Sequence, residues 1–265
     1  NGGSGVVVIK EPALTIPKTA PGVWSMNTVY DFVKSDNWVE TPAFISATGG
    51  TRTEDGDYAI HTFTASGPFS VTAAVGKPTA DSAADYLIVA GGGSGGNGNG
   101  NSPGGGGAGG VRASATTYTN AGPSSPRTAC VAAVTLTTQD YSIVVGAGDT
   151  GQAGPAPSPG TRRGTDSSGL GLTAGGGGAV SYHGGGGGCG NSGGSGGGAA
   201  GGGLNKSGGA GNTPPASPAQ GMPGGDRPGS GPDGSGGAGG GFMTACADAQ
   251  GPSRSEENTS ELQSR

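Results

Sequence analysis

The chain has 265 residues, of which 64 are glycine and 19 are proline, and its formal net charge is −5 at pH 7. Average proteins contain roughly 7% glycine and 5% proline, so this composition moves the chain away from ordinary globular enzymes. A mildly acidic chain without a cluster of Lys and Arg is unsuited to nucleic acid, because that binding rests on displaced counterions. No apolar run approaches the roughly 20 residues that span a bilayer, so we expect no membrane insertion.

The N-terminal block, residues 1–10, contains "GGSGVVVIK". Glycines followed by a β-branched run predict a strand. Because no initiator Met precedes it, we expect an internal fragment that opens with the closing strand of a preceding glycine-rich module.

The connector, residues 11–50, contains one helical pattern. Apolar side chains lie at Val29, Tyr30 and Val33, with Ser25 or Asn27 available as a cap. This spacing predicts a short helix that ends near Ser35.

Residues 51–84 alternate with a period of two on both sides of Ser66-Gly67. The pattern predicts a β-hairpin closed at that glycine. Asp55 and Asp57 resemble the start of a calcium loop but lack the remaining ligands, so we interpret them as turn residues. His61 has no nucleophile or carboxylate partner in its surroundings and is expected to be structural.

The glycine-rich block, residues 85–253, opens with the strand "DYLIVA" and contains two further strand candidates, Cys130–Leu136 and Tyr141–Gly148. From Gly146 to Gly241 six of 96 residues are large and apolar. Ordering a backbone costs roughly 1 to 2 kcal/mol per residue, and burying six such side chains at about 1.5 to 3 kcal/mol each does not offset that. Either these glycines form a disordered linker, or backbone hydrogen bonds hold them.

Gly91, Gly93 and Gly96 match the G-x-G-x-x-G pattern of dinucleotide sites after a plausible strand. Such a site needs a helix whose first amides hold the pyrophosphate, and an acidic residue some 20 positions later. The following "NGNGNSPGGGG" cannot form a helix, since Gly and Pro cost about 1 and 3 kcal/mol there. We therefore expect no nucleotide and no cofactor. Neither histidine lies in a catalytic motif, which disfavours an enzyme.

Cysteines 130, 189 and 246 are odd in number and widely spaced, so a disulfide scaffold is not expected. His183 and Cys189 lie near one another, but a zinc site needs about four ligands. We expect no metal.

Polyglycine favours an extended helix with three residues per turn and outward-pointing peptide groups. Segments of this kind can pack side by side and bond to one another, because glycine has no side chain to separate them. The fold class that follows is all-β: a small β-sandwich-like sheet region with long glycine-rich loops, polyglycine II-like or irregular, and one short helix. The polar islands between the glycine runs would then be turns at the ends of a bundle.

The succession "DGDYAIHTFTASGPFSV", "ADYLIVAGGGSGGNGNG", "PGGGGAGGV" and "TTQDYSIVVGAGDTGQAG" resembles the glycine-rich domain of phage tail fibres and other virion surface proteins. The resemblance implies a non-enzymatic, extracellular adhesion or structural module of a virion. Its expected partners are a host receptor, either a glycan or an outer-membrane protein, and other fibre subunits, with a homotrimer as the common arrangement. In related adhesins distal loops contact the receptor, and the corresponding islands here contain Arg162, Arg163, Tyr182, His183, Asn205, Lys206 and Arg227.

Two alternatives stay open beside this reading. A glycine-rich secreted wall or matrix protein would suit the irregular glycine blocks but not the alternating strands. An ice-binding polyglycine bundle would require a regular three-residue repeat, which is absent.

The C-terminal end departs from the resemblance, because "FMTACADAQGPS" replaces the expected closing strand after Gly241. The last segment, residues 254–265, looks like translated sequencing adapter and is set aside. A sheet that lacks its closing strand exposes an edge. We therefore expect the fragment to be truncated and poorly stable.

Overall fold

The chain is described by a computed structural model. Its described residues are 1–12, 45–56, 58–73, 82–96, 103–114, 132–151, 162–180, 188–201, 205–227 and 236–242. Within these ranges the structure consists of antiparallel strands and extended segments without an α-helix, so the expected all-β class is confirmed. None of these ranges holds a helix that could cross a membrane. The helix expected within residues 21–38 lies outside the described residues.

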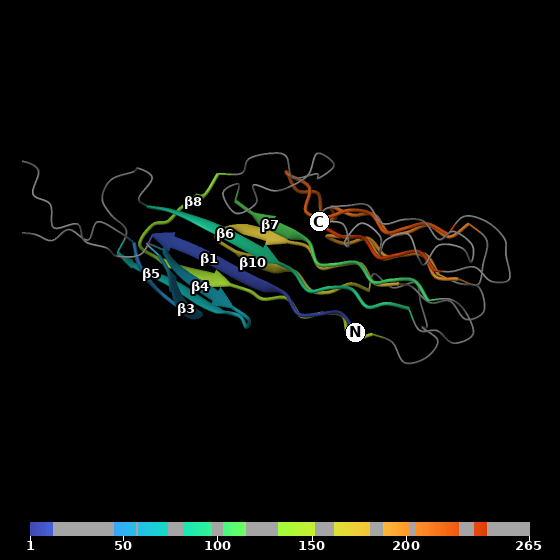
Figure 1. The fold of residues 1–265 in the computed structure, drawn as a ribbon, viewed down its shortest axis with the longest axis horizontal. Helices are drawn as coiled ribbons and strands as arrows, with labels where there is room; N and C mark the ends of the chain where they lie inside the picture. The colour runs from blue at the N-terminus through green and yellow to red at the C-terminus, as the bar shows by residue number, and fades with distance from the viewer. Residues whose placement is uncertain are drawn as a thin grey trace, which may run out of the picture.

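Two groups of strands form the part of the molecule drawn at the left of Figure 1. The larger is a six-stranded sheet in the order β3-β4-β1-β6-β7, with β8 paired to β6. Its strands are β1 (Val6–Pro12), β3 (Thr51–Asp55), β4 (Tyr58–Phe63), β6 (Ala83–Val89), β7 (Val111–Ala113) and β8 (Val134–Thr135). The smaller group is the sheet β2-β5-β9 and the hairpin β10-β11. Its strands are β2 (Ser46–Thr48), β5 (Gly67–Ala73), β9 (Asp140–Ile143), β10 (Ser167–Gly169) and β11 (Leu172–Ala174).

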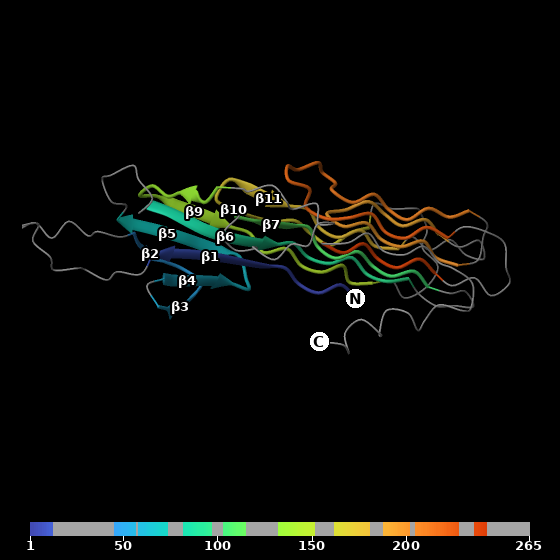
Figure 2. The same cartoon turned by 45° about the horizontal axis from the view of Figure 1, so that its top comes forward.

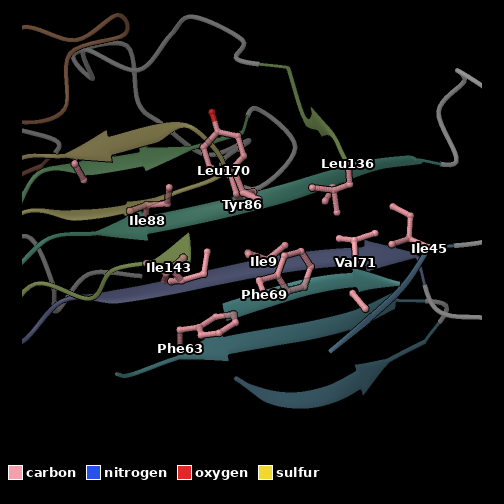
Figure 3. Close-up of a cluster of buried hydrophobic side chains, with 14 of the residues drawn as sticks. Ile9, Ile45, Phe63, Phe69, Val71, Tyr86, Ile88, Leu136, Ile143 and Leu170 are labelled. Atoms are coloured by element: carbon pink, nitrogen blue, oxygen red, sulfur yellow. The ribbon is translucent and has the colours of Figure 1, made fainter. Parts of the chain in front are cut away.

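The core lies between these two groups and follows the alternation of the strands. Val7 and Ile9 of β1 are fully buried, whereas Val8 between them is partly exposed on the other face. Phe69 of β5 meets Phe63 of β4 from the opposite sheet in an edge-to-face contact, with ring centroids 6.3 Å apart. Figure 3 shows how side chains of both sheets converge. The sandwich-like arrangement expected from the sequence is therefore present.

The hairpin expected across Ser66-Gly67 is wrong. The strands on either side, β4 and β5, lie in different sheets: β4 pairs with β1 and β3, and β5 pairs with β2 and β9. The hairpin in this region is β3-β4, closed at Gly56, which has a φ of +59°. The alternating pattern was correct, but alternation does not specify which strand is the partner. Because Phe63 and Phe69 belong to opposite sheets, the chain crosses from one sheet to the other at the turn between β4 and β5.

His61 is a structural residue, as expected. Its side chain is fully buried on β4. The ring nitrogen Nδ1 lies 2.8 Å from the carbonyl oxygen of Gly49, and the ring packs edge-to-face on Phe69 with centroids 5.1 Å apart.

The N-terminal strand β1 occupies the middle of the larger sheet. It pairs antiparallel with β4 on one side and with β6 on the other. The strand expected after Gly241 is therefore not needed to fill this position, and residues 243–265 lie outside the described ranges. This position of the sheet is therefore filled, because β1 pairs with the peptide groups of both neighbouring strands.

The glycine runs leave the sheets as extended segments that lie side by side in both views (Figures 1 and 2). We call this assembly the glycine bundle. It consists of residues 1–5, 90–96, 103–110, 145–151, 162–166, 174–180, 188–201, 205–212, 220–227 and 236–241.

Backbone hydrogen bonds in the glycine bundle repeat every three residues. The amides of Gly91, Gly92 and Gly93 donate to three different segments, through the carbonyls of Thr165, Gly3 and Gly107. The amides at positions 90, 93 and 96 all donate to the same neighbouring segment. A three-residue period is the period of the polyproline II helix, which has no internal hydrogen bonds and turns its peptide groups outward. Of the two alternatives left open by the sequence, the structure therefore shows the ordered polyglycine II-like bundle.

Glycine is required in this bundle because the segments approach closer than a side chain permits. A Cβ atom added to Gly176 would lie 1.8 Å from the carbonyl oxygen of Gly164, and one added to Gly178 would lie 1.9 Å from that of Asn191. Residues 174–180 and 193–200 are buried throughout, although they contain no side chain larger than valine. The interior of the bundle thus consists mainly of backbone.

Gln220 is a buried polar side chain where the glycine bundle meets the sheets. It is 1% exposed, accepts a hydrogen bond from the Gly175 amide at 2.6 Å, and donates to the Pro214 carbonyl at 2.5 Å. The backbone carbonyl of Gln220 accepts a hydrogen bond from the amide of Val111 at the start of β7. The side chain therefore supplies an acceptor that no neighbouring glycine segment provides to Gly175.

We expect Gln220→Ala to lower the free energy of unfolding by about 2 kcal/mol, because it leaves the buried Gly175 amide without its partner and removes the hydrogen bond to the Pro214 carbonyl. In a chain of this size that corresponds to a fall in Tm of roughly 4–8 °C. The matched control is Gln139→Ala, since the Gln139 side chain is exposed and donates to the Thr137 hydroxyl in a local turn. Thermal unfolding followed by circular dichroism measures both. Equal Tm values for the two variants would contradict the structural role of Gln220.

Candidate functional site

The glycine bundle has one end at the sheets and one end away from them, which we call the distal end. In sequence, the segments are connected by residues 97–102, 152–161, 181–187, 202–204 and 228–235, which lie outside the described residues. The segment ends that carry these connections lie together at the right of Figure 1. Backbone hydrogen bonds hold them at fixed positions: Ala179 donates to Arg162, Asn191 to Ala179, Gly190 to Ser207, and Arg227 to Lys206. Parts of the chain that are far apart in sequence thus meet at the distal end of the glycine bundle.

A polar cluster centred on Asp149 ties three segments together near the distal end. The carboxylate accepts from the Arg162 guanidinium at 3.0 and 3.1 Å and from the hydroxyl of Ser94. The carboxylate is 11% exposed and the guanidinium 25%, so water screens this ion pair less than an exposed one. The Arg162 carbonyl accepts from the amide of Ala179 and from the side chain of Asn191. This cluster organises the bundle itself.

The neighbouring residues Arg162 and Arg163 therefore have different roles. Arg162 is engaged on both its side chain and its carbonyl, and it belongs to the framework of the distal end. Arg163 is exposed and makes only a longer, partly exposed ion pair with Asp166, at 3.4 Å. The Arg163 side chain is thus available to a molecule that approaches the distal end.

The other residues that were predicted to contact a receptor also differ in their exposure. Asn205 is exposed and begins the segment 205–212 with a φ of +49°. Lys206 is partly exposed and forms a backbone bridge with Arg227. Arg227 is 5% exposed, so its guanidinium lies within the bundle and is not presented at the surface. Tyr182 and His183 lie outside the described residues.

Among the described residues no three His, Cys, Asp or Glu side chains gather closely enough to hold a metal ion. Gly91, Gly93 and Gly96 of the nucleotide-like motif run in an extended segment whose amides donate to neighbouring backbone carbonyls. Those amides are therefore occupied, and the expectation that no helix follows is confirmed for residues 91–96 and 103–110.

Three framework residues were not singled out from the sequence: Asp149, Asn191 and Gln220. Asp149 is one acidic residue within "VVGAGDTG", and its only available signal was a charge placed inside a glycine run. Asn191 and Gln220 likewise interrupt glycine-rich stretches. An isolated polar side chain in such a run has few neighbours to bond except backbone, so this position could have been read as a tie between segments.

Comparison with known families bears on the same part of the chain. A family model described as a glycine-rich domain matches residues 64–261. The match begins after β4, so β1, β3 and β4 precede it although they share a sheet with β6. Searches of curated proteins and of solved structures returned no match. Since the match covers well over half of the chain, the protein belongs to the glycine-rich domain family.

Proposed function

We propose that this chain is a non-enzymatic adhesion module of a phage tail fibre or related virion surface protein, exposed outside the cell, whose distal end contacts a host surface receptor. The observation that carries the proposal is that polar residues from distant parts of the sequence lie at the distal end of the glycine bundle. Arg163 lies more than 40 positions before Asn205 and Lys206 in sequence, yet their segments end at the same end of the glycine bundle.

The construction of the glycine bundle supports a binding role for its distal end. Side chains are excluded from the interior because added Cβ atoms would collide with neighbouring backbone. The stretches of sequence that connect the segments range from three residues at 202–204 to ten at 152–161. Binding residues are commonly placed on loops that a rigid scaffold positions. A rigid glycine bundle whose connecting sequences differ in length suits a protein that binds other surfaces at its distal end.

The residues at the distal end favour a polar receptor such as a surface glycan or the outer loops of a membrane protein. Arg163, Asn205 and Lys206 offer hydrogen-bond donors, and the sequence between the described segments adds Tyr182 and His183. Planar aromatic rings and fixed donors are the groups that orient polar ligands on protein surfaces. Other fibre subunits, arranged as a homotrimer, complete the proposed assembly.

The test is binding of the full chain, fused at its C-terminus to a fluorescent protein, to intact cells of a mixed bacterial community, with bound cells sorted and identified. We expect binding to a narrow group of bacteria and an at least tenfold loss in the variant Arg163→Ala/Asn205→Ala/Lys206→Ala. Arg52→Ala on β3 is the matched control, because Arg52 is an exposed cation with one exposed ion pair at the sheet end. It should bind like the parent chain.

Two results would contradict the proposal. One is undiminished binding by the triple variant, which would place the contact elsewhere. The other is binding to extracted wall or matrix polysaccharide with no binding to any intact bacterium, which would support a secreted matrix protein instead. A Tm measured for each variant ensures that lost binding does not reflect lost structure.

A further inference from the structure

The strand β1 is an N-terminal element inserted in the centre of a sheet. Its registers place Val7 opposite Phe63 of β4 and opposite Ile88 of β6. Both flanking strands come from later parts of the chain, and Val7 is fully buried between the two sheets. Among the described residues, β1 is therefore held in this position by non-covalent contacts with residues after position 44.

The same segment continues into the glycine bundle. The amides of Gly2 and Gly5 donate to the carbonyls of Asp149 and Gly146, at 2.8 and 2.7 Å, and the carbonyl of Gly3 accepts from Gly92 at 2.9 Å. Residues 1–12 thus fill one continuous slot that crosses both parts of the molecule.

On its C-terminal side this segment is joined to the rest of the fold through residues 13–44. Residues 13–44 lie between the end of β1 and the next described residue, Ile45. A chain of that length can span up to roughly 100 Å when extended. The strand itself, at 7 residues, is only about 23 Å long. The connection is therefore long enough for the segment to reach the slot of a neighbouring molecule.

We propose that residues 1–12 are an exchangeable strand, and that a second copy of this chain can supply them. An identical segment makes identical contacts in either slot, so exchange between copies replaces each contact with the same contact. Exchanging identical elements between protomers is a low-cost route to association. The inference is independent of the proposed receptor binding, since it concerns the sheet and not the distal end.

The slot is selective for this segment. It requires apolar side chains at Val7 and Ile9, which are fully buried. It also requires glycine at positions 2 and 5, where an added Cβ would lie 2.0 Å from the Gly92 carbonyl oxygen and 2.4 Å from that of Val89. A strand with other residues at these positions does not fit, so when a second molecule fills the slot it does so with its own residues 1–12.

The experiment traps exchanged strands by a disulfide. Val8 and Leu87 lie directly opposite one another on β1 and β6. Two full-length chains of different mass are prepared with Cys130, Cys189 and Cys246 changed to Ser, one with Val8→Cys and one with Leu87→Cys. They are unfolded together, refolded at increasing concentration and oxidised. We expect a heterodimer whose yield rises with concentration and exceeds by at least tenfold that of a Val8→Cys and Thr53→Cys mixture, because Thr53 pairs with Ile60 and not with β1.

A single chain carrying both Val8→Cys and Leu87→Cys shows that the pair can form a disulfide. If this chain closes internally while the mixture gives no heterodimer above the Thr53→Cys control, the proposal is overturned. A second measurement needs no cysteine. The unmodified chain refolded at high concentration should show a dimeric mass by light scattering, and excess synthetic peptide of residues 1–12 should suppress it. A monomeric mass at every concentration overturns the proposal.

Discussion

Gly93→Ala is expected to destabilise the protein by about 3 kcal/mol, near the upper end of the range for overpacked interiors. The added Cβ would lie 2.2 Å from the carbonyl oxygen of Gly178 and 2.4 Å from its carbon, both atoms of a buried backbone segment. Gly178 is itself bonded to Gly107 and Ser195, so it cannot retreat without breaking hydrogen bonds to two further segments. A single methyl group should therefore lower Tm by roughly 6–12 °C in a chain of this size.

The neighbouring residue provides the control. Gly92 lies in the same segment, but a Cβ added there would meet its nearest atom at 3.5 Å, an ordinary van der Waals distance. Gly92→Ala should leave the structure intact and stabilise it by about 0.4–1 kcal/mol, because alanine reduces the freedom of the unfolded chain. Chemical denaturation of both variants measures the difference. Equal effects at positions 92 and 93 would mean that the segments do not pack as described.

Val7→Asp should abolish cooperative unfolding or reduce stability by several kcal/mol, because it places an unpaired carboxylate in the apolar core. Val7 is fully buried and lies between Phe63 and Ile88 in the register of the sheet. The effect depends on β1 occupying the centre of the sheet, so it also tests whether the N-terminal strand completes this fold. The measurement is denaturation monitored by near-ultraviolet circular dichroism.

Val8→Asp is the matched control one position further along. Val8 is partly exposed on the outer face of the same strand, where a carboxylate keeps access to water. We expect a loss of about 1 kcal/mol or less for this variant. If Val8→Asp proved as damaging as Val7→Asp, the register of β1 would have to shift by one residue, since such a shift exchanges the two faces.

The strands were the most predictable part of this chain. The runs at Val6–Pro12 and Ala83–Val89 carry alternating or continuous apolar residues that are typical of strands, and both form as expected. Their partners were not predictable, because alternation records which side chains face the core but not which sheet receives the strand. The crossing between β4 and β5 at Ser66-Gly67 is the clearest case.

The glycine bundle was predictable as one of two alternatives. Composition excludes a conventional core but cannot distinguish disorder from a bundle, since both need glycine. What decides is the spacing of hydrogen bonds between distant segments, such as Gly107 to Gly178 and Gly198 to Gly105. Those pairings depend on the path of the whole chain and leave no local signal.

The division of the described polar residues into framework and surface was not predictable. Arg162 and Arg163 are adjacent and chemically identical. Only the position of Asp149, on a segment that precedes them by a long connection, makes Arg162 a framework residue. Arg163 instead faces outward because the extended backbone turns successive side chains in different directions.

Amide hydrogen exchange, resolved residue by residue, tests the central claim that backbone hydrogen bonds order the glycine-rich segments. We predict that the amides of Gly91, Gly93 and Gly178, and those of the buried segment 193–200, exchange as slowly as the amides of β1 and β6. Exchange of these glycine amides at the rate of an unstructured chain, while β1 and β6 remain protected, would show that the runs are linkers and would contradict the account.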